Sequence, residues 1–298
     1  MKERVVQFGP AQDLLGIETP SAPIENDPNR PTWIFLNAGI VHRVGPHRLT
    51  VNLARRIAGA GFPALRFDLS GLGDSSPRSA ATFQQAAVQD VRDAMDHLEQ
   101  STQARRFVLC GLCSGADNSV RAALVDPRIA GIALLDPYVY RTIGFYLRRS
   151  MQQVSSASSW KTLAMRMGAV LRRSARQPQT GVACNVDYQP SPPQPMYVRP
   201  TPTRSAFAAD LRTILDRGAH ILVIYSSLED YNYAGQFNAA FRRYGLNRRI
   251  RTEFLSASNH THTEIAQQRR LGDLLVAWAE GRFPAAPAHA GSQAGSAG

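Results

Sequence analysis

A glycine-flanked pentapeptide, Gly-Leu-Cys-Ser-Gly at residues 111–115, constrains the fold of this chain more than any other feature. The apolar run before it, residues 106–110, is typical of a short buried strand, and the pattern at 116–125 predicts a helix. A strand that turns directly into a helix through small flanking residues holds its central side chain, here Cys113, exposed at the tip of the turn. The pentapeptide therefore indicates an α/β fold in which a cysteine is placed for nucleophilic attack.

The rest of the chain repeats the alternation of strand and helix. Apolar runs typical of strands occur at 5–8, 14–18, 33–36, 63–67, 129–135, 221–225 and 251–255, and helical spacing occurs at 48–60, 83–98, 236–244 and 266–278. Such alternation predicts a mostly parallel sheet with helices on both faces.

One region, residues 138–205, breaks the alternation. It holds two helical patterns, at 143–154 and 160–173, and then a proline-rich stretch that cannot form a central strand. We therefore expect a core of residues 1–137 and 206–283 and a helical lid inserted at 138–205. Residues 284–298 are rich in Ala, Gly, Pro and Ser and are predicted to be a disordered tail.

Composition narrows the setting and the partners that we expect. No stretch of about 18 apolar residues occurs, so no membrane span is expected, and the first residues lack the apolar core of a signal peptide. Three cysteines give no disulfide framework, which favours a reducing, cytoplasmic setting. The net charge of +11 favours anionic partners in general, but no zinc-finger spacing or RNA-binding motif indicates a nucleic-acid module.

Short motifs follow several of the predicted strands. They are Asn37-Ala38-Gly39, Gly71-Leu72-Gly73-Asp74-Ser75, the pentapeptide at 111–115, Ser227-Leu228-Glu229-Asp230 and Ser258-Asn259-His260-Thr261. In this order they resemble the α/β-hydrolases of the serine aminopeptidase S33-like group, and in particular the hydrolases associated with exosortase and exopolysaccharide gene clusters, over roughly residues 1–283. The resemblance implies an α/β-hydrolase fold with a lid. The chain departs from the group at two places: Cys113 stands where serine is usual, and Asn37-Ala38 stands where many members carry His-Gly.

The residues expected to react form a Cys-His-Asp triad. Cys113 would sit at a helix N-terminus, where the local positive potential lowers the pKa of a thiol. His260, just after the last predicted strand, is expected to be the general base. Asp230, a short loop beyond the strand at 221–225, is expected to orient the imidazole, with Glu229 and Asp136 as alternatives.

Backbone donors and neighbouring side chains complete the expected site. The oxyanion hole should use the N–H of Ser114 and a second N–H in the loop after residue 36, at Gly39 or Ile40. Asp117, one turn into the helix, would oppose thiolate formation if it faces the sulfur. A second histidine, His262, hints at a metal site, but two imidazoles at this spacing lack further ligands, so no metal is expected.

The chemistry of a reactive thiol sets the expected function. We expect a cysteine-dependent acyl hydrolase, an esterase or thioesterase, that forms a covalent acyl-enzyme and needs no cofactor. The same intermediate would serve an acyltransferase that passes an acyl group from a carrier protein or a CoA-linked thioester to an amine or alcohol. A lactonase with a cysteine nucleophile and a non-catalytic binding subunit remain alternatives.

Overall fold

The computed structural model describes residues 2–21, 30–78, 82–155 and 199–285. The strands within these ranges form one eight-stranded sheet in the order β1-β2-β4-β3-β5-β6-β7-β8. Their bounds are β1 Arg4–Phe8, β2 Leu14–Thr19, β3 Thr32–Leu36, β4 Ala64–Phe67, β5 Phe107–Leu112, β6 Ile129–Leu135, β7 His220–Ser226 and β8 Arg251–Leu255. β2 pairs antiparallel with β1 and β4, whereas β4, β3, β5, β6, β7 and β8 run parallel. The predicted mostly parallel sheet is confirmed.

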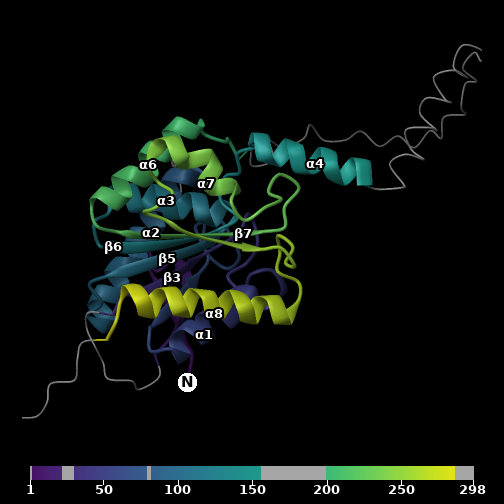
Figure 1. Ribbon diagram of the computed structural model, residues 1–298. Helices are drawn as coiled ribbons and strands as arrows, with labels where there is room; N and C mark the ends of the chain where they lie inside the picture. Colours follow the sequence, from purple (N-terminus) through teal and green to yellow (C-terminus); the bar gives the residue numbers. More distant parts are fainter. Residues whose placement is uncertain (1, 22–29, 79–81, 156–198, 286–298) are drawn as a thin grey trace, which may run out of the picture.

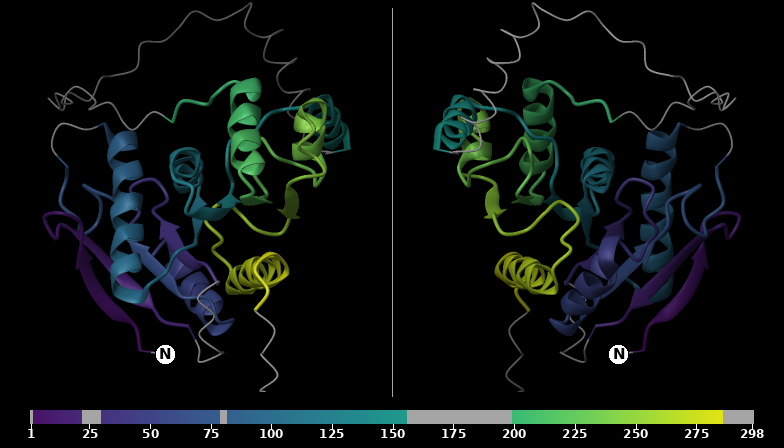
Figure 2. Two further views of the ribbon diagram at one scale, coloured as in Figure 1. Left: turned by 90° about the vertical axis from the view of Figure 1, so that its left-hand side faces the viewer. Right: turned by 90° about the vertical axis from the view of Figure 1, so that its right-hand side faces the viewer.

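Helices cover both faces of the sheet, as predicted (Figure 1). Their bounds are α1 Leu49–Gly59, α2 Phe83–Thr102, α3 Ser114–Val125, α4 Ile143–Ser155, α6 Arg204–Asp216, α7 Gln236–Phe241 and α8 Ile265–Arg282. α1 and α8 lie together on one face, and α2, α3, α6 and α7 lie on the other (Figure 2). α4 projects sideways beyond α7 (Figure 1). None of the helices among the described residues combines the length and the apolar character needed to cross a membrane.

Each face of the sheet packs against its own apolar core. All five residues of β3 are buried, because the side chains of a central parallel strand point alternately into two covered layers. Trp33 meets Trp278 of α8 with 5.9 Å between the ring centroids, whereas Ile34 belongs to the core under α2 and α3. This double burial explains why the central strands read as continuous apolar runs in the sequence.

Two parts of the chain differ from the sequence predictions or lie beyond them. Helix α6 was not predicted; it begins after Thr203, whose hydroxyl caps the Ala206 N–H, and it buries Phe207 and Leu211 against the core. The helical pattern at 160–173 and almost all of the predicted tail lie outside the described residues. The boundaries of the lid stay a prediction.

The parallel strands bring several loops to one edge of the sheet. β3, β4, β5, β6, β7 and β8 all end on the same side, so the segments that follow them meet there. The carboxyl edge of a parallel sheet is the usual place for a binding site in open α/β folds. Cys113, Asp136 and His260 follow β5, β6 and β8 respectively, and they lie at this edge.

Candidate active site

The turn between β5 and α3 holds Cys113 in a strained backbone conformation. Its φ of 57° and ψ of −115° lie in a region that non-glycine residues rarely adopt. The flanking glycines are required because the chain approaches itself closely: a Cβ at Gly111 would lie 2.2 Å from the carbonyl carbon of Gly115, and a Cβ at Gly115 would lie 2.6 Å from the Asn37 carbonyl oxygen. The turn therefore has the geometry of a nucleophile elbow, and it leaves Cys113 partly exposed.

His260 lies beside this cysteine and is held by a buried carboxylate. Its Nδ1 is 2.8 Å from Oδ2 of Asp136, which is only 1% exposed. Asp136 is itself fixed by Ser226, whose N–H donates to Oδ1 at 2.7 Å and whose hydroxyl donates to Oδ2 at 2.6 Å. Because Nδ1 is engaged, Nε2 is the ring nitrogen free to face the sulfur. The three side chains thus have the connectivity of a nucleophile, a base and an orienting acid.

The electrostatics of this group favour charge separation between the sulfur and the imidazole. The hydrogen bond to Asp136 is the largest of the causes that raise the pKa of His260 to about 9, and the hydrogen bond to Cys113 adds to it. Burial alone would raise the pKa of the Cys113 thiol, but the hydrogen bond with His260 and the charges of Arg199 and His260 hold that pKa below its usual value. Two groups that shift each other in opposite directions titrate as a pair, and both shifts act in favour of the thiolate–imidazolium form of that pair.

Asp230 does not take the position that the sequence analysis gave it. Its Oδ1 accepts hydrogen bonds from Nε and Nη2 of Arg141, at 2.9 and 2.6 Å, in a pair that is about half exposed. Asp136 occupies the place beside His260 instead, and Glu229 is exposed. The acid expected at Asp230 is therefore corrected to Asp136, one of the two alternatives considered from the sequence.

The expected oxyanion donors of Gly39 and Ser114 are close to the elbow, and each of them already faces an acceptor. The N–H of Gly39 donates to the hydroxyl oxygen of Ser114 at 2.7 Å. The N–H of Ser114 is directed to Cys113, where it is one of the causes that lower the thiol pKa after burial has raised it. The Ile40 N–H makes no hydrogen bond to another residue in the described part of the chain.

An ion pair that the sequence analysis missed lies against the sulfur. Arg199 donates from Nε and Nη2 to the two carboxylate oxygens of Asp117, at 2.5 and 2.7 Å. Its Nη1 lies 3.4 Å from the Cys113 sulfur, and its Nη2 lies 3.3 Å from the Cys113 carbonyl oxygen. Asp117 is 2% exposed. A buried carboxylate is normally paired with a cation, but the burial of Asp117 and the identity of its partner are visible only in the structure.

The remaining cysteine and histidine near the site have structural environments. Cys110 lies inside β5 at 1% exposure, and burial raises its pKa far above that of a free thiol. His262 is equally buried and shares a hydrogen bond of 2.7 Å with the Ser258 hydroxyl. Burial lowers the pKa of His262, which favours a neutral ring. Cys184 lies outside the described residues.

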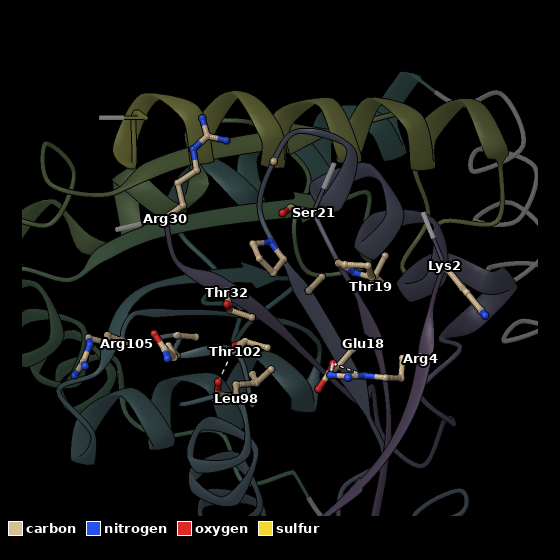
Figure 3. A pocket seen from close by; sticks show the side chains of 16 residues that line it. Lys2, Arg4, Glu18, Thr19, Ser21, Arg30, Thr32, Leu98, Thr102 and Arg105 are labelled. Carbon is tan, nitrogen blue, oxygen red and sulfur yellow. Dashed lines mark hydrogen bonds and ion pairs between the residues drawn. The ribbon is translucent and has the colours of Figure 1, made fainter. Parts of the chain in front are cut away.

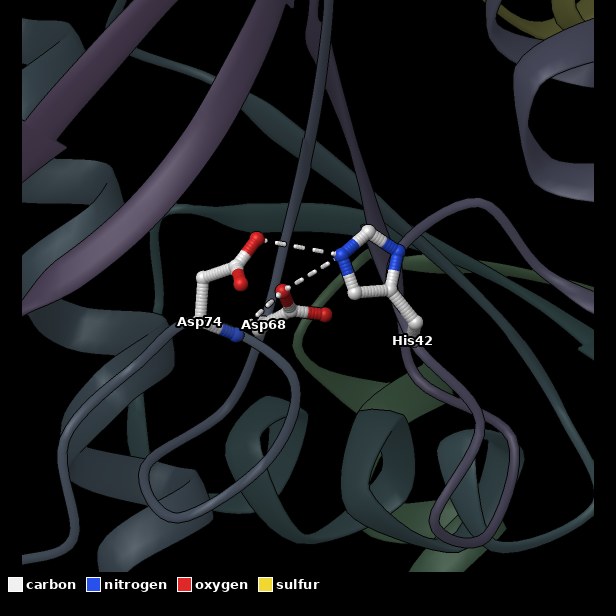
Figure 4. Close-up of side chains that lie close together, drawn as sticks. All are labelled: His42, Asp68 and Asp74. Atoms are coloured by element: carbon white, nitrogen blue, oxygen red, sulfur yellow. Dashed lines mark hydrogen bonds and ion pairs between the residues drawn. The ribbon is translucent and has the colours of Figure 1, made fainter.

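A second cluster of titratable groups lies at the same sheet edge, after β3 and β4. His42, Asp68 and Asp74 bring their ligand atoms within 4.8 Å of one another (Figure 4). The guanidinium of Arg43 donates to both carboxylates, so a cation of the protein already balances their charge. The cluster joins the two loops rather than presenting free ligands.

A cavity of about 740 Å³ lies at the opposite, amino edge of the sheet (Figure 3). It is bounded by the end of β2, the starts of β3 and β4 and the end of α2, and its lining includes Arg4, which is paired with Glu18. Neither Cys113 nor His260 nor Asp136 lines it. The cavity is therefore separate from the candidate active site.

Solved structures similar to this chain have the same fold. They include a putative α/β hydrolase of unknown function from Agrobacterium tumefaciens, with 14% identity, a TM-score of 0.55 and coverage of 96% of this chain and 99% of that chain. An esterase from Pyrococcus furiosus shows 11% identity, a TM-score of 0.57 and coverage of 95% and 91%. An α/β serine hydrolase without a lid from Xanthomonas campestris shows 14% identity, a TM-score of 0.55 and coverage of 96% and 98%. At these identities the likeness shows the fold alone.

The sequence itself points to one family. No curated protein matches it. Residues 39–188, half of the chain, match the family model described as serine aminopeptidase, S33. The matched segment contains most of the loop after β3, the turn at Cys113, and Asp136. The chain belongs to the serine aminopeptidase S33 family and has the α/β-hydrolase fold.

Proposed function

We propose that this protein is an acyl hydrolase that works through a covalent thioester at Cys113. The observation that carries the proposal is the position of Cys113: it is held at the tip of a strained turn beside His260, whose other ring nitrogen is fixed by the buried Asp136. A thiolate is a strong nucleophile toward acyl carbonyls, and a partly exposed sulfur can be reached by a substrate.

The proposed reaction has two steps. In the first, Sγ of Cys113 bonds to the carbonyl carbon of an ester or thioester, and the leaving alkoxide or thiolate takes a proton from Nε2 of His260. In the second, His260 removes a proton from water, the water oxygen attacks the acyl carbon, and the C–S bond breaks to release the acid and the thiolate. Asp136 keeps Nδ1 protonated and stabilises the imidazolium in both steps.

The oxyanion formed in each step would be held by backbone donors. The N–H of Ser114 is already directed to the reacting side of the elbow. The N–H of Gly39 becomes available when the Ser114 hydroxyl turns away from it. A well-aimed donor contributes about 3–4 kcal/mol in the transition state, so the hydrogen bond between Gly39 and Ser114 is expected to influence the rate.

Intact-mass spectrometry with a panel of acyl thioesters tests the proposal. The native chain should gain the mass of the acyl group, Cys113→Ala should not, and Ser114→Ala should still be acylated. Addition of water alone or of amine acceptors then separates hydrolysis from acyl transfer, because both begin with the same intermediate. Acylation of the Cys113→Ala variant at the native rate would refute the assignment and indicate another nucleophile. A native chain that no thioester modifies would refute it in favour of a non-catalytic subunit.

A further inference from the structure

We propose that Arg199 is the counter-ion that keeps Cys113 in its thiolate form against the buried charge of Asp117. Arg199 and Asp117 then act as one unit that sets the reactivity of the nucleophile. The inference deepens the proposed function and depends on Cys113 being the nucleophile.

Arg199 contacts two groups that can carry negative charge, the Asp117 carboxylate and the Cys113 sulfur. Its fork closes on both oxygens of Asp117, and its Nη1 still faces the sulfur at 3.4 Å. The guanidinium also lies over the ring of Tyr138, with 4.6 Å from Cζ to the ring centroid. A planar fork with several donors suits this position, because it can satisfy a carboxylate and face a second anion at once.

The charges that face the sulfur show why the cation is needed. Arg199, from the segment before α6, and His260, from the loop after β8, contact the sulfur, while Asp117 of α3 lies behind Arg199 and Asp136 lies behind His260. The ring of Tyr138 lies against the guanidinium of Arg199. Without Arg199, a thiolate would share the site with two carboxylates and only one imidazolium. Like charges at this distance disfavour ionisation, and an opposite charge restores it.

The ionisation of the groups agrees with this balance. Burial raises the pKa of the Cys113 thiol, and the charge of Arg199 is among the causes that bring that pKa below its usual value. Burial lowers the pKa of Arg199, and the hydrogen bonds and charge of Asp117 more than restore it. Arg199 therefore stays charged although it is largely covered.

Alkylation of Cys113 by iodoacetamide over a range of pH values tests the inference in the full chain. The variants are Arg199→Gln, Asp117→Asn and the double variant, with the site of labelling located by peptide mass spectrometry. Arg199→Gln should raise the thiol pKa by about one pH unit or more and slow alkylation by roughly tenfold at pH values below the native thiol pKa. Asp117→Asn should lower the thiol pKa, and the double variant should return to within about threefold of the native rate, because both charges are removed together.

Controls separate charge from packing. Arg141→Gln removes one positive charge from the exposed pair with Asp230 and should leave the alkylation profile unchanged. If Arg199→Gln fails to fold, the double variant, which leaves no unpaired buried carboxylate, and Arg199→Lys, which keeps the charge, carry the test. A double variant as slow as Arg199→Gln, or a native thiol pKa in Arg199→Gln, would overturn the inference. A native Cys113 that reacts no faster than an ordinary thiol would overturn the proposed function itself.

Discussion

The exchange of Asp136 for asparagine should distinguish the acid that the structure places beside His260 from Asp230, the acid expected from the sequence. The new amide oxygen can still accept the Ser226 N–H, but the amide nitrogen replaces Oδ2, which in the native chain accepts from both His260 and the Ser226 hydroxyl. The amide N–H groups of the variant would then face two other donors, the Nδ1–H of His260 and the hydroxyl of Ser226. Asparagine tolerates the φ of 48° at this position as well as aspartate does, so the backbone should be kept.

The size of the effect follows from the imidazole pKa. The rise of the His260 pKa from 6.5 to about 9 corresponds to roughly 3.4 kcal/mol at about 1.36 kcal/mol per pH unit. The His260 side chain is 42% exposed, and Asp136 is one of several causes, so solvent screening reduces the share of Asp136 to about 1–2 kcal/mol. We therefore expect the Asp136→Asn variant to have a His260 pKa about one unit lower or more, and an acylation rate reduced by roughly 10²–10⁴ because the ring is held in the wrong tautomer.

Two measurements check this prediction. Proton NMR of the His260 ring, assigned with a His260→Gln variant, reports the pKa, and single-turnover acylation reports the rate. The pKa of His260 is raised on folding, so its contribution to the free energy of unfolding is complete below pH 6.5 and is lost as the pH rises through about 9; Asp136→Asn should reduce this dependence. Asp230→Asn is the matched control and should retain native values, since an exposed pair contributes about 0–1 kcal/mol. A large loss in Asp230→Asn with a native Asp136→Asn would refute the reasoning.

Three further predictions concern the elbow and its surroundings. Gly115→Ala should lower the free energy of unfolding by about 1–3 kcal/mol and remove most of the acylation rate, because its Cβ would lie 2.6 Å from a backbone oxygen. The control is Gly59→Ala in α1, whose Cβ meets nothing within 4 Å and which should raise the free energy of unfolding by up to about 1 kcal/mol in a thermal unfolding assay. Equal effects of the two substitutions would contradict the close approach at Gly115. Cys110 should resist iodoacetamide until the chain unfolds, since burial raises its pKa, and labelling in the native state at the rate of Cys113 would speak against this burial. His262→Ala should lower the melting temperature through a loss of about 1–3 kcal/mol but keep acylation within several-fold, and a complete loss of acylation in a folded variant would assign His262 a direct role.

The fold could be predicted from the sequence because buried parallel strands have a plain signature. All eight strands of the described sheet fall within one or two residues of apolar runs bounded by turn residues. Helix α6 escaped prediction because it begins directly after a proline-rich stretch that the sequence analysis assigned to the lid, although Phe207, Leu211 and Ile214 follow helical spacing. The local sequence pattern was sufficient to predict an element that lies between two other helices or strands. It was not sufficient to predict α6, which lies beside the predicted lid.

The site was predicted only as far as strand ends could locate it. Cys113 and His260 follow their strands closely, and the structure brings them together. Asp136 and Asp230 both follow strands at the same edge, and the sequence cannot tell which one reaches the imidazole. The positive φ of Asp136 and its bonds to Ser226 decide this. Arg199 meets the sulfur across 86 residues of chain, a contact that no local pattern encodes.

Asn37, which is 4% exposed, links the loop after β3 to the loop after β4. Its amide nitrogen donates to the Val41 carbonyl and to Asp68, and its amide oxygen accepts the Leu69 N–H. One side chain therefore braces the segment that carries Gly39 against the segment that follows β4. A disturbance in the second segment would reach the first through Asn37 and through the ion pairs of Arg43 with Asp68 and Asp74, so substitutions well away from the sulfur are expected to weaken the hold on a bound acyl oxygen.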